Sequence, residues 1–468
     1  MLTRGVRLAF PRLRVGCVSW IIAVYLFDVI VIRRDDLPAS IANILKENYK
    51  VFSRAFKYHN YRLYFSGQMI SVIGTWIQRI AMSWLIYRIT GSAWLLGIVG
   101  FTSQIPSLIL SPVVGVIADR QNRLQLIIIT QCLAMLQAFV VAALTISNTI
   151  QVWHIISLSL FLGVVSAFDM PTRQAFVQDM IEKKEDLSNA IAMNSLLFNG
   201  ARLIGPMIAG ILVATVGEGI CFLLNGLSYI AVIIALFMIR VKKREKPVTQ
   251  RRFMDDFIDG ARYSFGFIPI RYILINMSII GFFGLPYITL MPIFARDILQ
   301  GGPKTYGFLM ASVGIGALIS GSIFAMRRSL RGIGTAIAVS CTVFSIGIIL
   351  FSLSPVLWLS MIFLVILGFG QITTFASSNT SLQTMADENM RGRVLAFYHA
   401  AIMGIAPFGN LIAGAAAEKI GAPNTLLIGG IVCLLGAFHF YLNIPRLRKI
   451  VRPIFMQMGV EYPEQRSV

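Results

Sequence analysis

From residue 60 onward, the sequence repeats one kind of segment, a long and mostly apolar stretch bounded by polar connections. Each stretch is long enough for a helix to cross the hydrocarbon core of a bilayer, which takes about 20 residues. We expect such helices at residues 64–87, 93–117, 124–146, 152–173, 189–214, 218–239, 271–295, 305–326, 333–353, 356–377, 392–416 and 421–443. The longest connection separates the sixth stretch from the seventh. The pattern therefore predicts an all-α membrane protein with twelve transmembrane helices in two six-helix bundles.

The composition excludes the soluble alternatives. Of the 468 residues, 56% are hydrophobic and 13% are charged, whereas ordinary soluble domains have about 25% charged residues. A soluble protein of this size cannot bury that much apolar surface, which excludes a soluble enzyme, a disordered chain and a disulfide-linked secreted module. The cysteines stand singly inside apolar stretches, so we expect neither disulfides nor a metal site.

The net charge of +20 is concentrated in alternate connections, among them those that hold Arg123, Lys183 and Arg391. The positive-inside rule places these connections, and both ends of the twelve-helix core, in the cytoplasm. Binding to nucleic acid is the alternative for so basic a chain. Because the basic connections lack interleaved aromatic residues, we expect no nucleic-acid partner.

The expected helices divide the chain into five parts. Residues 51–239 form the first bundle and residues 271–445 the second. Between them, residues 240–270 form a basic cytoplasmic loop, in which Phe253, Phe257, Ala261 and Phe265 recur every four residues and predict an amphipathic helix. Residues 446–468 form a cytoplasmic tail. Residues 1–50 are an N-terminal extension of uncertain role, which could be a signal-like segment, a thirteenth helix or an upstream extension of the reading frame.

The two halves also resemble each other in sequence. Ile204–Gly210 in the fifth stretch matches Phe408–Gly414 in the eleventh, and Gly217 matches Gly421 at the same separation. Duplicated halves around a cavity at the middle of the membrane are typical of secondary transporters. The alternative is a general packing face of small residues, which does not explain the shared separation.

Two arginines lie deep in the expected helices. An ionisable side chain in the hydrocarbon layer is costly, so Arg202 and Arg79 are candidates for function. No acidic residue is expected at their depth, which favours an anionic or catecholate-like substrate. Alternatively, Arg202 bonds to neighbouring helices and only fixes their packing, while Arg79 extends to the membrane surface. Further residues that could line a substrate cavity are Gln78, Asn194, Asn199 and Trp76.

A second group of ionisable residues is expected nearer the cytoplasm. Asp169 and Arg173 are four residues apart, and therefore on one face of the fourth helix. Asp169 is a candidate for proton coupling, although it could equally form a static salt bridge. His399 is the other candidate because histidine titrates near neutral pH. The competing interpretation of His399 is a hydrogen-bonded core residue.

Several motifs resemble the major facilitator superfamily. Gly115-Val-Ile-Ala-Asp119-Arg120-Gln-Asn-Arg123 is similar to motif A of these transporters, which closes the cytoplasmic side in the outward-open state. Asn60–Gln68, Asp169–Phe176 and Ala201–Pro206 resemble one bacterial branch, that of the enterobactin exporter and multidrug efflux pumps. The resemblance implies that Asp119 faces Arg391 and Arg393, that Asp169 pairs with Arg123 or Arg173, and that transport is proton-driven efflux.

These observations together predict a secondary active transporter of the bacterial inner membrane. We expect it to export a siderophore or similar organic anion by alternating access, coupled to protons. Its partners are then the bilayer, protons and a small anionic or aromatic substrate, and it acts as a monomer without a cofactor. The alternatives are multidrug efflux, lysophospholipid transport and a non-transporting membrane scaffold. An enzyme is not expected, because the sequence has no P-loop and no Ser/His/Asp set in a supporting context.

Overall fold

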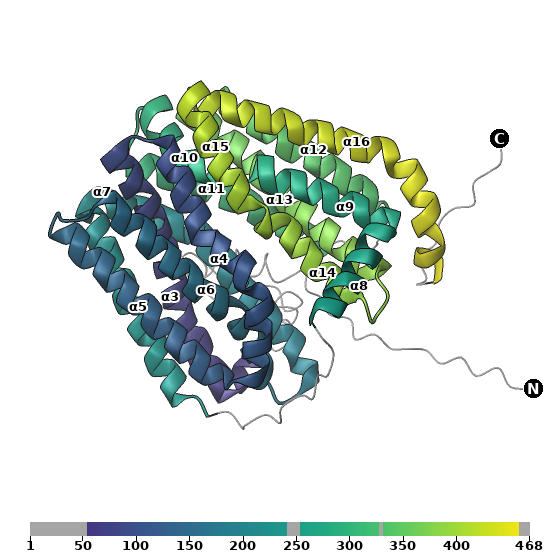
Figure 1. Ribbon diagram of the computed structural model, residues 1–468, viewed down its shortest axis with the longest axis horizontal. Coiled ribbons are helices and arrows are strands. Elements are labelled where there is room, and N and C mark those ends of the chain that lie inside the picture. The colour runs from purple at the N-terminus through teal and green to yellow at the C-terminus, as the bar shows by residue number, and fades with distance from the viewer. Residues whose placement is uncertain (1–53, 241–252, 327–330, 458–468) are drawn as a thin grey trace, which may run out of the picture.

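The computed structural model describes residues 54–240, 253–326 and 331–457, and within these ranges the chain is helical, with no β-strand. The first bundle consists of α3 (His59–Thr90), α4 (Ala93–Arg120), α5 (Arg123–Ile146), α6 (Val152–Asp179) and α7 (Lys184–Met238), and the short helix η3 (Ala55–Lys57) precedes it. The second bundle consists of α9 (Ile268–Ile279), η4 (Ile280–Gly284), α10 (Tyr287–Ile293), η5 (Phe294–Ile298), α11 (Pro303–Met326), α12 (Ile333–Ser352), α13 (Leu357–Met385), α14 (Arg391–His399), η6 (Ala400–Gly404), α15 (Ala406–Ile420) and α16 (Ala422–Gln457). Helix α8 (Phe253–Gly266) lies between the two bundles in the sequence. Figure 1 shows the two bundles side by side.

The helices account for the twelve predicted crossings. Among the residues that the structure describes, eleven helical segments are long and apolar enough to span a membrane. One of them, α7, has 55 residues and contains a non-helical residue, Gly217. A straight helix of that length would measure about 80 Å, far more than a bilayer needs. The chain therefore crosses once before Gly217 and once after it, and the predicted all-α fold of twelve transmembrane helices in two bundles is confirmed.

The internal repeat extends to the backbone. Gly217 has φ 81° and ψ 169°, and Gly421, at the C-terminus of α15, has φ 84° and ψ 152°. This region of φ and ψ is essentially restricted to glycine. Matched glycines therefore make the same turn in both halves, between the fifth and sixth crossings and between the eleventh and twelfth.

The two bundles touch through pairs of glycines. A Cβ at Gly210 of α7 would lie 2.8 Å from the Cα of Gly307 in α11. On the other side of the molecule, a Cβ at Gly97 of α4 would lie 3.1 Å from the Cα of Gly414 in α15. Small residues are what let membrane helices approach this closely. Each bundle thus contributes two helices to the interface, and Gly210 and Gly414 belong to the repeat.

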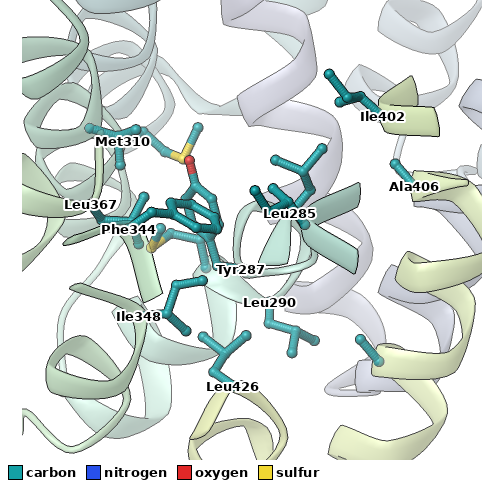
Figure 2. Close-up of a cluster of buried hydrophobic side chains, with 14 of the residues drawn as sticks. Leu285, Tyr287, Leu290, Met310, Phe344, Ile348, Leu367, Ile402, Ala406 and Leu426 are labelled. Atoms are coloured by element: carbon teal, nitrogen blue, oxygen red, sulfur yellow. The ribbon is translucent and has the colours of Figure 1, made fainter. Parts of the chain in front are cut away.

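Inside the second bundle, the seventh crossing is not one continuous helix. It passes through α9, η4, α10 and η5, which include two π-helical segments. Tyr287 of α10 is fully buried among Phe344 of α12, Leu367 of α13 and Met310 of α11 (Figure 2). Since lipid chains are as apolar as these side chains, close packing rather than the hydrophobic effect holds them together. This packing fixes the broken crossing in place.

Two elements extend what the sequence predicted. Helix α16 continues to Gln457, so the first part of the expected tail is helical.

The amphipathic helix expected in the central loop is α8, and it packs on α14. The ring centres of Phe257 and Phe397 are 5.2 Å apart, and the guanidinium of Arg393 lies 3.7 Å from the carboxylate of Asp259. Burial raises the pKa of Tyr263 in α8, whose hydroxyl accepts a hydrogen bond from the backbone N–H of Asp387. The expectations for residues 1–50 and for the basic residues at 241–252 fall outside the described residues.

Candidate transport site

Arg202 connects the two bundles near the middle of the helices. Its guanidinium donates to Oε1 of Gln371 on α13 at 3.3 Å. The hydroxyl of Tyr287 on α10 donates to the same oxygen at 3.2 Å. Gln371 and Tyr287 are buried, whereas Arg202 is partly exposed. A cation of the first bundle is thus held by a neutral amide oxygen of the second.

Arg79 provides a second cation beside the first. It lies on α3, with its guanidinium carbon 4.9 Å from the centre of the Trp76 ring. Helices α3 and α7 approach closely here, since a Cβ at Gly205 would lie 2.5 Å from the Cβ of Trp76. Arg79 is exposed, yet close enough to Arg202 and Tyr306 to interact electrostatically with both. Among the described residues, neither Arg79 nor Arg202 forms an ion pair with a carboxylate.

The amide side chains predicted to line a cavity occupy different surroundings. Gln78 is buried inside the first bundle, where it donates to Gln137 at 2.8 Å and accepts from Asn225 at 2.6 Å. Asn199 is exposed and bonds to its own helix, at the carbonyl of Ser195. Asn194 is half-buried, and its Oδ1 has no partner among the described residues. The structure therefore groups Trp76 with the two arginines and places Gln78 in an interhelical network.

Asp169 and Arg173 form an ion pair of 2.5 Å on α6. The other oxygen of Asp169 accepts from Thr130 at 2.9 Å and from Gln131 at 2.7 Å, both on α5. Arg173 also donates to Gln68 of α3 at 2.6 Å. Three helices of the first bundle thus meet at one buried ion pair.

Some polar atoms around this pair are buried without a partner among the described residues. They are the hydroxyl of Tyr64, Nε2 of Gln68, Oε1 of Gln131 and Nε of Arg173. Buried polar groups in native proteins are nearly always satisfied, by protein or by ordered water. The surroundings of Asp169 can therefore accommodate water or a rearranged set of hydrogen bonds.

We call the end of the bundles that carries Arg123, Arg391 and the C-terminus of α16 the basic end. Here Arg123 pairs with Asp179 at 3.1 Å. Of the two partners expected for Asp169, Arg123 and Arg173, the structure shows Arg173. Arg391 is exposed, and Arg393 contacts Asp259 of α8. The core of the motif A prediction, which is Gly115 and the side chains of Asp119 and Arg120, lies outside what the structure describes.

His399 is not a core residue. It ends α14 as an exposed side chain, and its Nδ1 contacts the carbonyl of Leu395 one turn earlier. The interpretation of His399 as a buried histidine is therefore wrong, because its position on the helix points away from the packed interior.

Polar contacts between the two bundles close the other end. Tyr87 of α3 bonds through its hydroxyl to Asp297, and its carbonyl accepts from Arg296 at 3.2 Å. Glu418 of α15 accepts from the hydroxyl of Ser92 at 3.1 Å and from the backbone N–H of Trp94 at 3.0 Å. The carboxylate of Glu418 thus sits at the N-terminus of α4, where the helix dipole favours a negative charge.

Sequence reasoning missed several of these residues. Tyr287, Thr130 and Gln131 look like ordinary polar residues of apolar helices, and nothing in their spacing distinguishes them. Asp179 could have been found, had the fourth helix been extended past residue 173, because it then lies on the last turn near Arg123.

The chain crosses the membrane twelve times in two repeated bundles. Cations lie between the bundles, and polar contacts between the bundles close one end. These features define a secondary transporter of the major facilitator type. Comparison with known families makes the assignment more specific. Residues 53–452 match the family described as transmembrane secretion effector, and the chain belongs to this family. It is therefore a multi-pass membrane transporter of a small-molecule substrate, and not an enzyme.

Relatives with assigned roles are similar over most of their length. The staphyloferrin A transporter of Staphylococcus aureus is 27% identical, over 81% of this chain and 95% of its own. The multidrug efflux pump Tap of Mycolicibacterium fortuitum is 22% identical, over 81% and 93%. The macrolide efflux protein A of Streptococcus pyogenes is also 22% identical, over 81% and 96%. The chain thus falls in the branch of siderophore and multidrug transporters.

Solved structures support the fold alone. The crystal structure of the nucleoside transporter NupG superimposes with a TM-score of 0.63 at 12% identity and covers 82% of this chain and 98% of its own. An inward-facing bacterial homologue of the lysosomal transporter Spinster gives a TM-score of 0.63 at 12% identity, over 84% and 98%.

Proposed function

We propose that the protein exports a siderophore or similar organic anion from the bacterial cytoplasm across the inner membrane, in exchange for protons. The observation that carries this proposal is the pair of cations, Arg202 and Arg79, which lie between the bundles without a carboxylate partner among the described residues. The relationship to a staphyloferrin A transporter supports a siderophore as the anion.

The neutral partner of Arg202 explains how an anion would be recognised. An anion at 4 Å from a guanidinium gains about 4 kcal/mol at an effective dielectric constant of 20, before the cost of desolvation. A carboxylate or catecholate of the substrate would replace Oε1 of Gln371 as the acceptor for Arg202. Trp76, beneath Arg79, provides an aromatic surface for a ring of the substrate.

Proton coupling is assigned to Asp169. In the structure its carboxylate is paired with Arg173. When the helices move and the pair separates, the carboxylate can take up a proton. His399 is the second candidate, since it is exposed near the basic end.

Alternating access then involves one set of closing contacts at each end of the bundles. The contacts of Tyr87 and Glu418 close the end opposite the basic end. In the other state, the basic end would be closed by the motif A residues together with two residues of α6: Gly115, Asp119, Arg120, Arg123, Asp169 and Arg173.

Both bundles come from one chain, so the transporting unit is a monomer. The basic end faces the cytoplasm.

Uptake into inverted membrane vesicles tests this proposal. We expect an acidic interior to drive uptake of an anionic aromatic compound, and a protonophore to abolish it. Arg202→Gln should lower that uptake about tenfold or more, since it removes part of the Coulomb attraction. Arg202→Lys should be intermediate, because it keeps the charge but not the planar fork. Arg62→Gln, an exposed position on α3, is the matched control.

A matched neutral compound and a matched cationic compound complete the test. We expect little uptake of either. If only the cationic compound is taken up, and Arg202→Gln transports it normally, the arginine is structural and the protein is a multidrug pump like Tap. If a lysophospholipid is the only substrate moved, the protein is a lysophospholipid transporter.

A further inference from the structure

A groove at the basic end lies outside the transport site. It runs between α9, α12, α13 and α16 and contains a cavity of about 70 Å³. Apolar side chains form most of these walls, among them Ile273, Ile337, Phe440 and Ile444. Arg448 of α16 stands on its rim. Apolar walls with a cation at the mouth are typical of a site for an amphiphilic anion.

The N-terminus of α12 opens into this groove. Ile333, Gly334 and Thr335 of its first turn line the wall. No side chain of the described residues caps this helix, which begins after Gly332 in a left-handed conformation. The first N–H groups of a helix have no partner within it, and such termini bind phosphate and other anions.

A second observation points to a ligand at the same place. Ser381 of α13 lines the groove and is 3% exposed, yet its hydroxyl has no hydrogen-bond partner among the described residues. A buried hydroxyl without a partner is rare in native proteins. A phosphate oxygen in the groove would satisfy it.

The surroundings of the groove identify the source of the anion. Helix α16 runs along the outer edge of the second bundle (Figure 1). Just before the groove it exposes large apolar side chains, such as Phe438, Tyr441 and Leu442, as a lipid-facing surface does. Basic pockets between transmembrane helices near the cytoplasmic side bind anionic lipid headgroups. The apolar walls would hold the first part of an acyl chain.

We propose that this groove binds an anionic phospholipid of the adjacent leaflet. The phosphate lies at the N-terminus of α12, within reach of Ser381 and Arg448, and an acyl chain lies against Phe440 and Ile444. The site is separate from the transport site, so its occupant is a bound lipid and not the exported substrate.

Native mass spectrometry of the full-length protein in detergent tests this proposal. The probes are dioleoyl-phosphatidylglycerol and dioleoyl-phosphatidylcholine, which have the same chains but differ in charge. We expect phosphatidylglycerol to be retained preferentially, and Arg448→Gln to weaken its binding about tenfold, since a charge-assisted contact is lost. Arg446→Gln removes the same charge from the same helix, but Arg446 does not line the groove, so binding should be unchanged.

A second variant separates the groove from general charge effects. Gly334→Leu should fill the groove and block binding, because a Cβ at Gly334 meets no atom within 4 Å and the helix can accept it. Melting temperatures without added lipid establish that each variant is folded. Equal retention of the two lipids, or equal losses in Arg448→Gln and Arg446→Gln, would overturn the proposal. So would displacement of phosphatidylglycerol by inorganic phosphate, which would indicate a simple anion site.

Discussion

At the scale of single residues, the buried ion pair between Asp169 and Arg173 is the feature with the largest energetic consequence. Both side chains are largely buried, and each oxygen of the carboxylate has a partner. Removal of one partner of such a pair leaves an uncompensated charge and costs about 3–5 kcal/mol. We expect Asp169→Asn to lower the melting temperature in detergent markedly. The double variant Asp169→Asn, Arg173→Gln should lose less than the sum of the two single variants, because it removes both charges.

Arg88→Gln is the control for this measurement. Arg88 also pairs with a carboxylate, that of Glu218; the side chain of Arg88 is 52% exposed, whereas that of Glu218 is 10% exposed. Because water reaches Arg88, this pair is screened more than the one between Asp169 and Arg173, so the melting temperature should fall less than in Asp169→Asn. Additive losses in the Asp169 and Arg173 variants would mean that the two side chains act independently.

At the scale of helices, the two bundles meet at glycine contacts that lie toward the end closed by Tyr87 and Glu418. Gly210 allows α7 to touch α11, and an added methyl group there would meet backbone atoms that cannot move aside. We expect Gly210→Ala to shift the protein toward the state that is open at the end opposite the basic end. Gly200→Ala is the control in the same helix, because a Cβ there meets nothing within 4 Å.

Spin labels at Ile89 and Lys304, near the ends of α3 and α11, measure this shift as a distance distribution. The distribution should move to longer distances in Gly210→Ala and remain as in the wild type in Gly200→Ala. An unchanged distribution in both variants would show that the glycine contact does not control closure.

Much of the helix layout could be predicted from the sequence, because hydropathy is a property of contiguous residues. Gly217 and Gly421 could be matched because they share one separation with the other residues of the repeat, but the turn that each of them makes was not predicted. The site could be predicted only in part. Arg202 is conspicuous as a charge in an apolar helix, but its partner Gln371 is 169 positions away in the sequence. Nothing local specifies which of many polar residues such a side chain meets.

At the scale of the whole molecule, the distribution of charge predicts the orientation in the membrane. The basic connections should lie in the cytoplasm. A reporter enzyme that is active only outside the cytoplasm should be silent when fused after Arg244 or after Val468. It should be active when inserted at Asn148, in the turn between α5 and α6 at the other end. Activity after Arg244 would reverse the orientation, and the proposed direction of export with it.

The glycine contacts between α7 and α11 and between α4 and α15 have a consequence for the speed of transport. At these points backbone meets backbone, without interlocked side chains that must change rotamer when the helices move. Because no side chain has to change rotamer at these contacts, we expect the bundles to rotate against each other over a low barrier. The turnover rate would then be limited by the breaking of the polar bonds at the ends, such as those of Tyr87 and Glu418, rather than by the interface on which the bundles turn.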